Sequence, residues 1–298
     1  MQQNSVTAIF LPIALGIIML GLGLSLTIAD FKRIVVYPKA VFVGLLCQTI
    51  LLPLACFGVA SAFDLPPELA VGLMLLSASP GGPTANLYSH LAHGDVALNI
   101  TLTATNSILS LFTLPFIVNF AMSHFMSQTH QLPLQFAKVM EVFVIVLVPV
   151  GIGMLVHANA KKVADGLAKP VRILSAVLLV IVVAGAIAKE KAHLAGYFQQ
   201  VGLAALAFNL ASMGAGYFVP LLLKLPKKQA VAIGMEIGIH NGTLAIAIAQ
   251  SPRLLNNTTM AIPPAIYSLI MFLTAAVFGF VVSRQLRPES QPPAAGTT

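Results

Sequence analysis

The chain has 298 residues, of which 58% are hydrophobic and 8% are charged, and its mean hydropathy is +0.92. Soluble globular proteins contain about 25% charged residues, so this composition excludes a water-soluble domain and indicates an integral membrane protein. The net charge of +7 comes from short Lys and Arg clusters between apolar segments, which does not fit a nucleic-acid-binding surface.

Apolar segments long enough to cross a bilayer follow one another along the whole chain, and we count nine of them. The predicted transmembrane helices lie at roughly 6–28, 39–62, 67–92, 95–122, 138–158, 170–188, 197–223, 228–250 and 262–283. Their short connections leave no room for a soluble domain, so residues 1–287 are expected to form one all-α transmembrane domain. Acidic residues such as Asp30 are expected in loops, and the Pro-rich tail at 288–298 is expected to be disordered.

Basic residues are distributed unequally between the two sides of the predicted membrane domain. One set of alternate loops contains twelve Lys and Arg residues, whereas the other set contains four. Because basic loops stay on the cytoplasmic side, we expect a cytoplasmic C-terminus and, with nine spans, an N-terminus outside. The protein is therefore predicted to be a multi-pass protein of the plasma membrane, as in a bacterial inner membrane.

The third segment is interrupted at its middle by the sequence PGGP, residues 80–83. Pro80 and Pro83 each remove a backbone donor and clash with the preceding turn, and the two glycines between them allow the chain to open. We therefore expect two half-helices in place of one straight helix, with Thr84 and Asn86 directly after the break.

The eighth segment contains the second interruption, in the sequence GMEIGIHNGTLAIAIAQ at 234–250. It places Glu236, His240, Asn241 and Thr243 at membrane depth, where an ionisable group costs about 2.5 kcal/mol or more unless it is paired, solvated or neutralised by an ion. Its glycines let the backbone leave helical geometry, which a membrane tolerates only in protein or beside a cavity. The segment predicts a broken helix with an ion site.

The interrupted segments are the third and the eighth, and because this offset of five is odd, they cross the membrane in opposite directions. This is typical of an inverted-topology repeat, in which matching broken helices from the two halves meet at the substrate site. The second half then has five spans and the first half four, so the first half lacks its opening helix.

Polar side chains inside the other segments are few. Gln48 lies in the second segment, and Asn99, Thr103 and Asn106 recur at intervals of four and three in the fourth, which puts them on one helix face. Oxygen ligands suit a hard cation, and a single carboxylate with neutral oxygens balances a monovalent ion better than a divalent one. Together with Glu236, these residues predict a sodium site.

Three motifs at these positions resemble those of the bile acid:sodium symporter family: PGGPTAN at 80–86, HGDVALN at 93–99 and EIGIHNGTLAIA at 236–247. The match continues in register from about Leu11 to Arg284. The resemblance implies a core domain, in which the two discontinuous helices cross, and a panel domain. The core would comprise the spans at about 39–122 and part of 197–283, and the panel those at about 6–28, 138–158 and 170–188.

The resemblance also implies a function, which is the sodium-coupled symport of an organic anion, such as a bile-acid-like steroid or a small carboxylate, by alternating access. One or two sodium ions would be bound. The first sodium site would use Asn86, Asn99, Thr103 and Glu236. The second would use Gln48, Glu236, the backbone carbonyls of Ile237 and Ile239, and His240. The substrate would meet Thr84, Pro83 and Asn241. The anion and the lipid bilayer are the implied partners, with no obligate protein partner and no enzymatic activity.

His240 is the main departure from the family pattern, because it stands in the place of a Gln. An imidazole nitrogen is a poorer sodium ligand than an amide oxygen and titrates near neutral pH, so we expect a weakened second site or pH-dependent transport. A proton-coupled organic anion carrier that uses Glu236 and His240 is therefore an alternative, and a membrane sensor that does not transport its ligand is another. An intramembrane zinc hydrolase is disfavoured because the HExxH motif is absent from the sequence.

Overall fold

The computed structural model describes residues 5–126, 136–189, 194–252 and 254–286. Within these ranges the regular elements are helices, and no β-strand occurs, which confirms the predicted all-α class. Five of the described helices are long and apolar enough to cross a membrane, or six spans if the bent pair α1 and α2 is counted as one more.

Each predicted segment contains one helix or a pair of consecutive helices. The helices at uninterrupted segments are α1 (Ser5–Ser25), α7 (Val96–Phe125), α8 (Phe136–Asn159), α9 (Lys161–Lys189), α10 (Leu194–Leu222) and α13 (Ile262–Leu286). Helix α9 begins well before the predicted start at 170, so the basic residues at 161–169 lie in the helix and not in a loop. The third segment is divided into α5 (Pro67–Ala78) and α6 (Pro83–Leu91), and the eighth into α11 (Lys227–Gly238) and α12 (Gly242–Gln250). A short 3-10 turn, η3 (Thr259–Ala261), precedes α13.

The second segment is not a regular helix, because a π-helical turn interrupts it. It consists of α3 (Pro38–Leu46), the π-turn η1 (Cys47–Leu51) and α4 (Leu52–Ala62). The Leu52 amide donates to the Cys47 carbonyl five residues back. Pro53 has no N–H to continue the normal ladder, which accounts for the widened turn. Gln48 therefore projects from an irregular part of the helix.

The breaks of the two interrupted helices pair with each other. Gly81 and His240 form an antiparallel bridge. The Gly82 amide donates to the Ile239 carbonyl at 2.7 Å, and the Asn241 amide donates to the Pro80 carbonyl at 2.9 Å. Unwound backbone at membrane depth must find protein partners, and here each break supplies them for the other.

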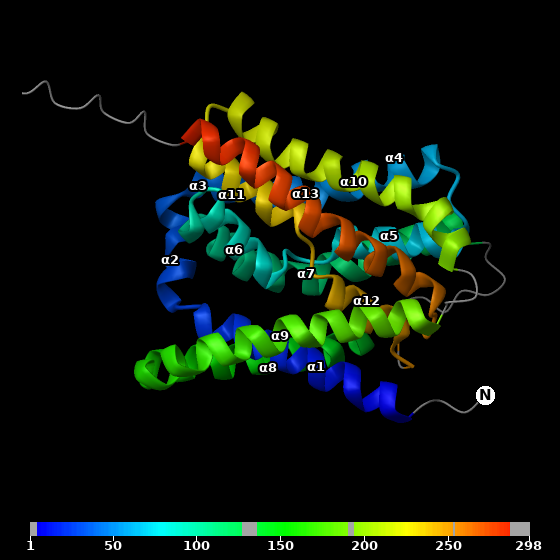
Figure 1. The fold of residues 1–298 in the computed structure, drawn as a ribbon, viewed down its shortest axis with the longest axis horizontal. Coiled ribbons are helices and arrows are strands. Elements are labelled where there is room, and N and C mark those ends of the chain that lie inside the picture. The colour runs from blue at the N-terminus through cyan, green and yellow to red at the C-terminus, as the bar shows by residue number, and fades with distance from the viewer. Residues whose placement is uncertain (1–4, 127–135, 190–193, 253, 287–298) are drawn as a thin grey trace, which may run out of the picture.

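Three helices form a layer of their own along the lower side of Figure 1. Helices α1, α8 and α9 pack on one another, and the other helices lie above them, with α12 between the two groups and in contact with α9. All residues of α12 are buried, as are those of α11 from Ala230 onward. The interrupted helices thus occupy the interior, where their polar groups are shielded from lipid.

The outer faces of the helices are apolar. Phe116, Leu222 and Leu273 are 73%, 80% and 72% exposed, and other large apolar side chains are exposed on most of the long helices. A water-soluble protein seldom exposes so much contiguous apolar surface, so these faces fit contact with lipid chains.

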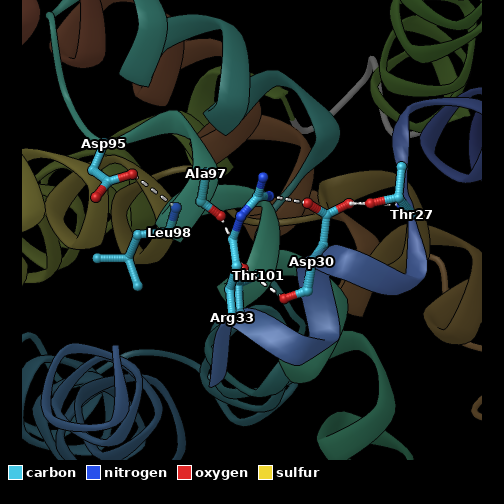
Figure 2. Close-up of polar contacts among 7 residues, drawn as sticks. All are labelled: Thr27, Asp30, Arg33, Asp95, Ala97, Leu98 and Thr101. Atoms are coloured by element: carbon cyan, nitrogen blue, oxygen red, sulfur yellow. Dashed lines mark hydrogen bonds and ion pairs between the residues drawn. The ribbon is translucent and has the colours of Figure 1, made fainter. Parts of the chain in front are cut away.

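The prediction that Asp30 lies in a loop is wrong. The residues between the first two segments form α2 (Ile28–Val36), and the Asp30 side chain is buried in it. Figure 2 shows that Asp30 accepts hydrogen bonds from the amide and hydroxyl of Thr27, at 2.6 and 2.8 Å, and pairs with Arg33. The Thr101 hydroxyl of α7 donates to the Asp30 carbonyl at 2.8 Å. This short helix was missed because it is too short to span, although Thr27 and Asp30 form a capping box.

Candidate functional site

Glu236 lies at the centre of the molecule, two residues before the end of α11, and its exposed fraction is 0%. The Thr103 hydroxyl donates to Glu236 Oε2 at 2.6 Å, and Asn106 Nδ2 lies 3.5 Å from Oε1. The one ion pair in the described part of the chain joins Arg33 to Asp30, so no described cation neutralises Glu236. Two neutral donors do not offset the cost of burying a full charge, so this carboxyl group must bind either a cation or a proton.

Buried amide oxygens without a hydrogen-bond partner are present on the helices around Glu236. They belong to Gln48, Asn86, Asn99, Asn106 and Asn209. In four of these side chains the NH₂ group donates to a protein oxygen, and Asn99 Nδ2 to the Ala232 carbonyl at 2.7 Å is an example. If one of these side-chain amides were flipped, its oxygen would face the carbonyl or carboxylate oxygen that its NH₂ group now contacts. The hydrogen-bond partners therefore fix the orientation of each amide. The amide groups that remain without a partner are therefore oxygen acceptors, which are suitable ligands for sodium.

The structure brings together three of the residues predicted for the first sodium site. Asn99 and Thr103 lie on one face of α7, and Asn99 is bonded to α11 one turn before Glu236, which Thr103 contacts directly. Asn86 lies on α6, which packs against both α7 and α11, and its Oδ1 atom is buried without a partner.

Two of the residues predicted for the second sodium site, Gln48 and His240, meet at the end of α5. Gln48 Nε2 donates to the Ser79 carbonyl at 2.9 Å, and His240 Nδ1 lies 3.4 Å from the same oxygen. The imidazole is 1% exposed and stacks on Phe208, with ring centroids 5.8 Å apart. The Ile239 carbonyl accepts the Gly82 amide at the crossing, so one of its lone pairs is already used.

Sequence reasoning missed the groups that hold the last turn of α11. Asn209 Nδ2 on α10 and the Tyr267 hydroxyl on α13 both donate to the Gly238 carbonyl at 3.0 Å. Tyr267 also contacts the His240 ring, at 5.4 Å between centroids. The available signal was weak, because Asn209 and Tyr267 are single polar residues with no recognisable motif around them.

A cavity of about 460 Å³ lies between α1, α9 and the crossing. That volume is within the usual range for small-molecule sites, about 300–1,000 Å³. Thr84 and Asn241 line it, as predicted residues for substrate contact, and so do Asn86 and His240. Pro83 begins α6, and its side chain lies outside what the structure describes.

The two half-helices that begin at the crossing, α6 and α12, direct their N-termini toward this cavity, since Thr84 and Thr243 of their first turns line it. Helix N-termini carry a partial positive charge and favour anions. None of the described residues that line the cavity is Lys, Arg, Asp or Glu. The cavity therefore offers polar groups at the crossing, with Ser25 and Ser175 on the α1 and α9 side, among apolar residues such as Ile18 and Leu22.

Comparisons with known proteins point to one family. The family model described as "Sodium Bile acid symporter family" matches residues 12–197. A Bacillus subtilis protein named "Uncharacterized sodium-dependent transporter YocS" is 28% identical over 93% of this chain and 84% of its own length. The Arabidopsis thaliana "Probable sodium/metabolite cotransporter BASS1, chloroplastic" is 28% identical over 94% of this chain and 68% of its own.

A mammalian relative extends the same similarity. The "Ileal sodium/bile acid cotransporter" of Oryctolagus cuniculus is 27% identical over 90% of this chain and 77% of its own length. All three relatives are named as transporters and none as an enzyme, which agrees with the prediction that this chain is not an enzyme. Because the family model covers more than half of the chain, this protein belongs to the sodium bile acid symporter family.

Proposed function

We propose that this protein is a secondary transporter that couples sodium movement to the uptake of an organic anion. The observation that carries the proposal is the fully buried Glu236 carboxyl group, which has no described cationic partner and lies among helices with unpartnered amide oxygens. A sodium ion would neutralise the carboxylate and fill acceptors that nothing else in the described chain fills. The names of the relatives, all of which refer to sodium, support this coupling ion.

Two sodium sites would share Glu236. The first would add Asn86, Asn99 and Thr103, and the second would add Gln48, His240 and the backbone carbonyls of Ile237 and Ile239. Because these groups come from η1, α6, α7, α11 and the break that follows α11, a bound ion would draw separate elements together at the crossing. The closed crossing would then present Thr84, Pro83 and Asn241 to the substrate, so ion and substrate would increase each other's affinity.

The substrate would be an organic anion with an apolar body, such as a bile-acid-like steroid or a small carboxylate. Its charged end would lie at the N-termini of α6 and α12, because the described lining contains no Lys or Arg. Its apolar part would contact the walls that α1 supplies, such as Ile18 and Leu22.

Alternating access would follow from motion between two groups of helices. Helices α1, α8 and α9 would form the panel domain and the remaining helices the core, which would contain an inverted repeat. The five described long helices and the bent pair α1 and α2 make six spans. Helix α8 and the two interrupted helices would bring the number to nine. The N-terminus would lie outside, the C-terminus in the cytoplasm, and the protein in the plasma membrane.

Uptake into proteoliposomes tests this function. Labelled organic anions would be supplied under an inward sodium gradient, with choline in place of sodium as the ionic control. We expect sodium-dependent uptake that Glu236→Gln reduces to the background of empty vesicles. Glu68→Gln, at the first turn of α5, serves as the matched control and should transport normally.

Other outcomes would select the alternatives. Uptake that ignores sodium and follows a proton gradient would identify a proton-coupled carrier that uses Glu236 and His240. Substrate binding without counterflow would identify a sensor. Transport that is unchanged between pH 5.5 and 8 at saturating sodium would contradict the expectation that His240 makes transport pH-dependent.

A further inference from the structure

A second, much smaller cavity lies between η1, the end of α5 and α7. Its volume is about 10 Å³, which is enough for one water molecule or one small ion. It shares no lining residue with the large cavity. Five of its lining side chains contain oxygen: Gln48, Thr49, Asn106, Ser110 and Thr113.

The two amides at this cavity have used their donors elsewhere. Gln48 donates through Nε2 to the Ser77 and Ser79 carbonyls, at 3.3 and 2.9 Å, and its Oε1 atom is buried without a partner. Asn106 directs Nδ2 toward Glu236, and its Oδ1 atom is likewise buried without a partner. Both side chains are at least nine-tenths buried, with exposed fractions of 4% and 2%. The groups left over are carbonyl oxygens, which accept and do not donate.

The three hydroxyl groups also donate their hydrogens, in each case to a backbone carbonyl of the same helix. Thr49 donates to the Leu45 carbonyl at 2.7 Å, Ser110 to the Ser107 carbonyl at 3.0 Å, and Thr113 to the Leu109 carbonyl at 3.3 Å. The five polar side chains that line the cavity therefore offer oxygens that can accept but have no hydrogen left to donate. A water molecule has only two hydrogens to donate, whereas a cation interacts with all acceptors around it.

The position of the cavity connects it to Glu236. Asn99, Thr103, Asn106, Ser110 and Thr113 follow each other at intervals of four and three, so they lie on one face of α7 that extends for about 21 Å. Thr49 and Thr113 are half-buried, Ser110 and Asn106 are buried, and Glu236 is fully buried. Asn106 connects the cavity to Glu236, because its Nδ2 atom lies near the Glu236 carboxylate and its Oδ1 atom has no hydrogen-bond partner.

We propose that this cavity is a binding station for a monovalent cation on a route to Glu236 that does not pass through the substrate cavity. The station binds a sodium-sized ion through the Gln48 and Asn106 carbonyl oxygens and the Thr49, Ser110 and Thr113 hydroxyls. Gln48 is also a ligand of the proposed second sodium site, so it serves the two positions in turn. From there the ion moves past Asn106 to the carboxylate. The identity of the ion as sodium rests on the proposed function, whereas the existence of a cation site does not.

Thallium(I), a monovalent cation with strong anomalous scattering, tests the site directly. Crystals of the full chain soaked in a thallium salt should show an anomalous peak among Gln48, Asn106 and Ser110. The double variant Ser110→Ala/Thr113→Val removes two oxygens without touching Glu236 and should lose that peak. Thr105→Val is the matched control, because Thr105 is a half-buried α7 hydroxyl bonded to its own helix at Thr101, away from the cavity.

A sodium concentration jump on proteoliposomes tests the route. The rate constant of the charge displacement should fall about tenfold in the double variant and stay within twofold of wild type in Thr105→Val. The substrate KM at saturating sodium should not change. The proposal is overturned if the wild type shows no thallium peak in the cavity, or if the double variant and Thr105→Val have the same rate constant. Sodium-dependent uptake by the wild type tests the proposed function separately, because the thallium peak does not depend on it.

Discussion

Glu236 is buried opposite a glycine because a larger residue would leave no room for its carboxylate. A Cβ atom added to Gly81 would overlap the Glu236 carboxyl group. Gly81 also forms the bridge with His240, so its neighbours on both sides are fixed by the crossing. The absence of a side chain at this one position thus allows the break between α5 and α6 to lie against the buried acid of α11.

We predict that Gly81→Ala lowers the apparent sodium affinity at least tenfold, which corresponds to about 1.4 kcal/mol. The added methyl group must push the carboxylate away from Thr103 and Asn106. The sodium dependence of uptake measures the effect. Gly58→Ala is the control, because a methyl group there meets no atom within 4 Å. An unchanged sodium dependence in Gly81→Ala would show that the carboxylate position does not set ion affinity.

Helix α2 connects α1 to the rest of the molecule and is hydrogen-bonded to α7. Helices α1 and α2 are bent by 63° at their break. Asp30 holds the first turn of α2 through Thr27 and Arg33, and its carbonyl is bonded to Thr101 of α7 (Figure 2). Helix α2 is therefore held to α7, and the bend lies between it and α1.

We expect Asp30→Ala to destabilise the protein by about 2 kcal/mol, because it leaves the Thr27 amide and hydroxyl without their acceptor. The Arg33 ion pair adds little, since that side chain is 36% exposed and screened by solvent. Thermal unfolding of the purified protein in detergent is the measurement. Asp165→Ala, at an exposed position of α9, should leave the melting temperature almost unchanged. Equal effects of the two variants would contradict an anchoring role for Asp30.

In the molecule as a whole, the large cavity lies between helices of both groups. Its walls include Ser25 on α1 and Ala176 on α9, whereas Thr84 and Asn241 belong to the crossing. The residues proposed for sodium all lie on the crossing side, on helices other than α1, α8 and α9. The proposed sodium residues therefore meet the cavity at Asn86 and His240, whereas its α1 and α9 walls are separate from the proposed sodium sites.

This separation predicts that filling the cavity blocks substrate without removing ion binding. Ala176→Trp should reduce uptake more than tenfold, because the indole occupies substrate volume, while sodium affinity should stay within twofold of wild type. Labelled-substrate uptake and sodium titration provide the two readouts. Ile173→Trp, at a 56% exposed position of α9 outside the cavity, is the control and should transport normally. A parallel loss of sodium binding in Ala176→Trp would show that the two sites are not separable.

The positions of the helices could be predicted from the sequence because a helix that crosses a bilayer requires a long apolar segment. Helix-breaking residues within such a segment indicate backbone that is buried in protein or lines a cavity. The ends of α7 and α13 lie within four residues of the predicted boundaries. The π-turn around Gln48 and the short helix α2 were not predicted. Both depend on local hydrogen-bond geometry within or beside an apolar segment, which hydropathy does not register.

The sequence by itself determined that this protein spans a membrane, that two of its helices are broken, and that a buried acid lies in one break. Only the tertiary structure decided which groups surround that acid. The hydrogen bond from Thr103 to Glu236 joins residues 133 positions apart, and the bridge from Gly81 to His240 spans a still longer separation. Contacts of this kind arise when distant helices pack, and no local pattern of residues encodes their register. The amide oxygens left without partners, and the two cavities, follow from that packing alone.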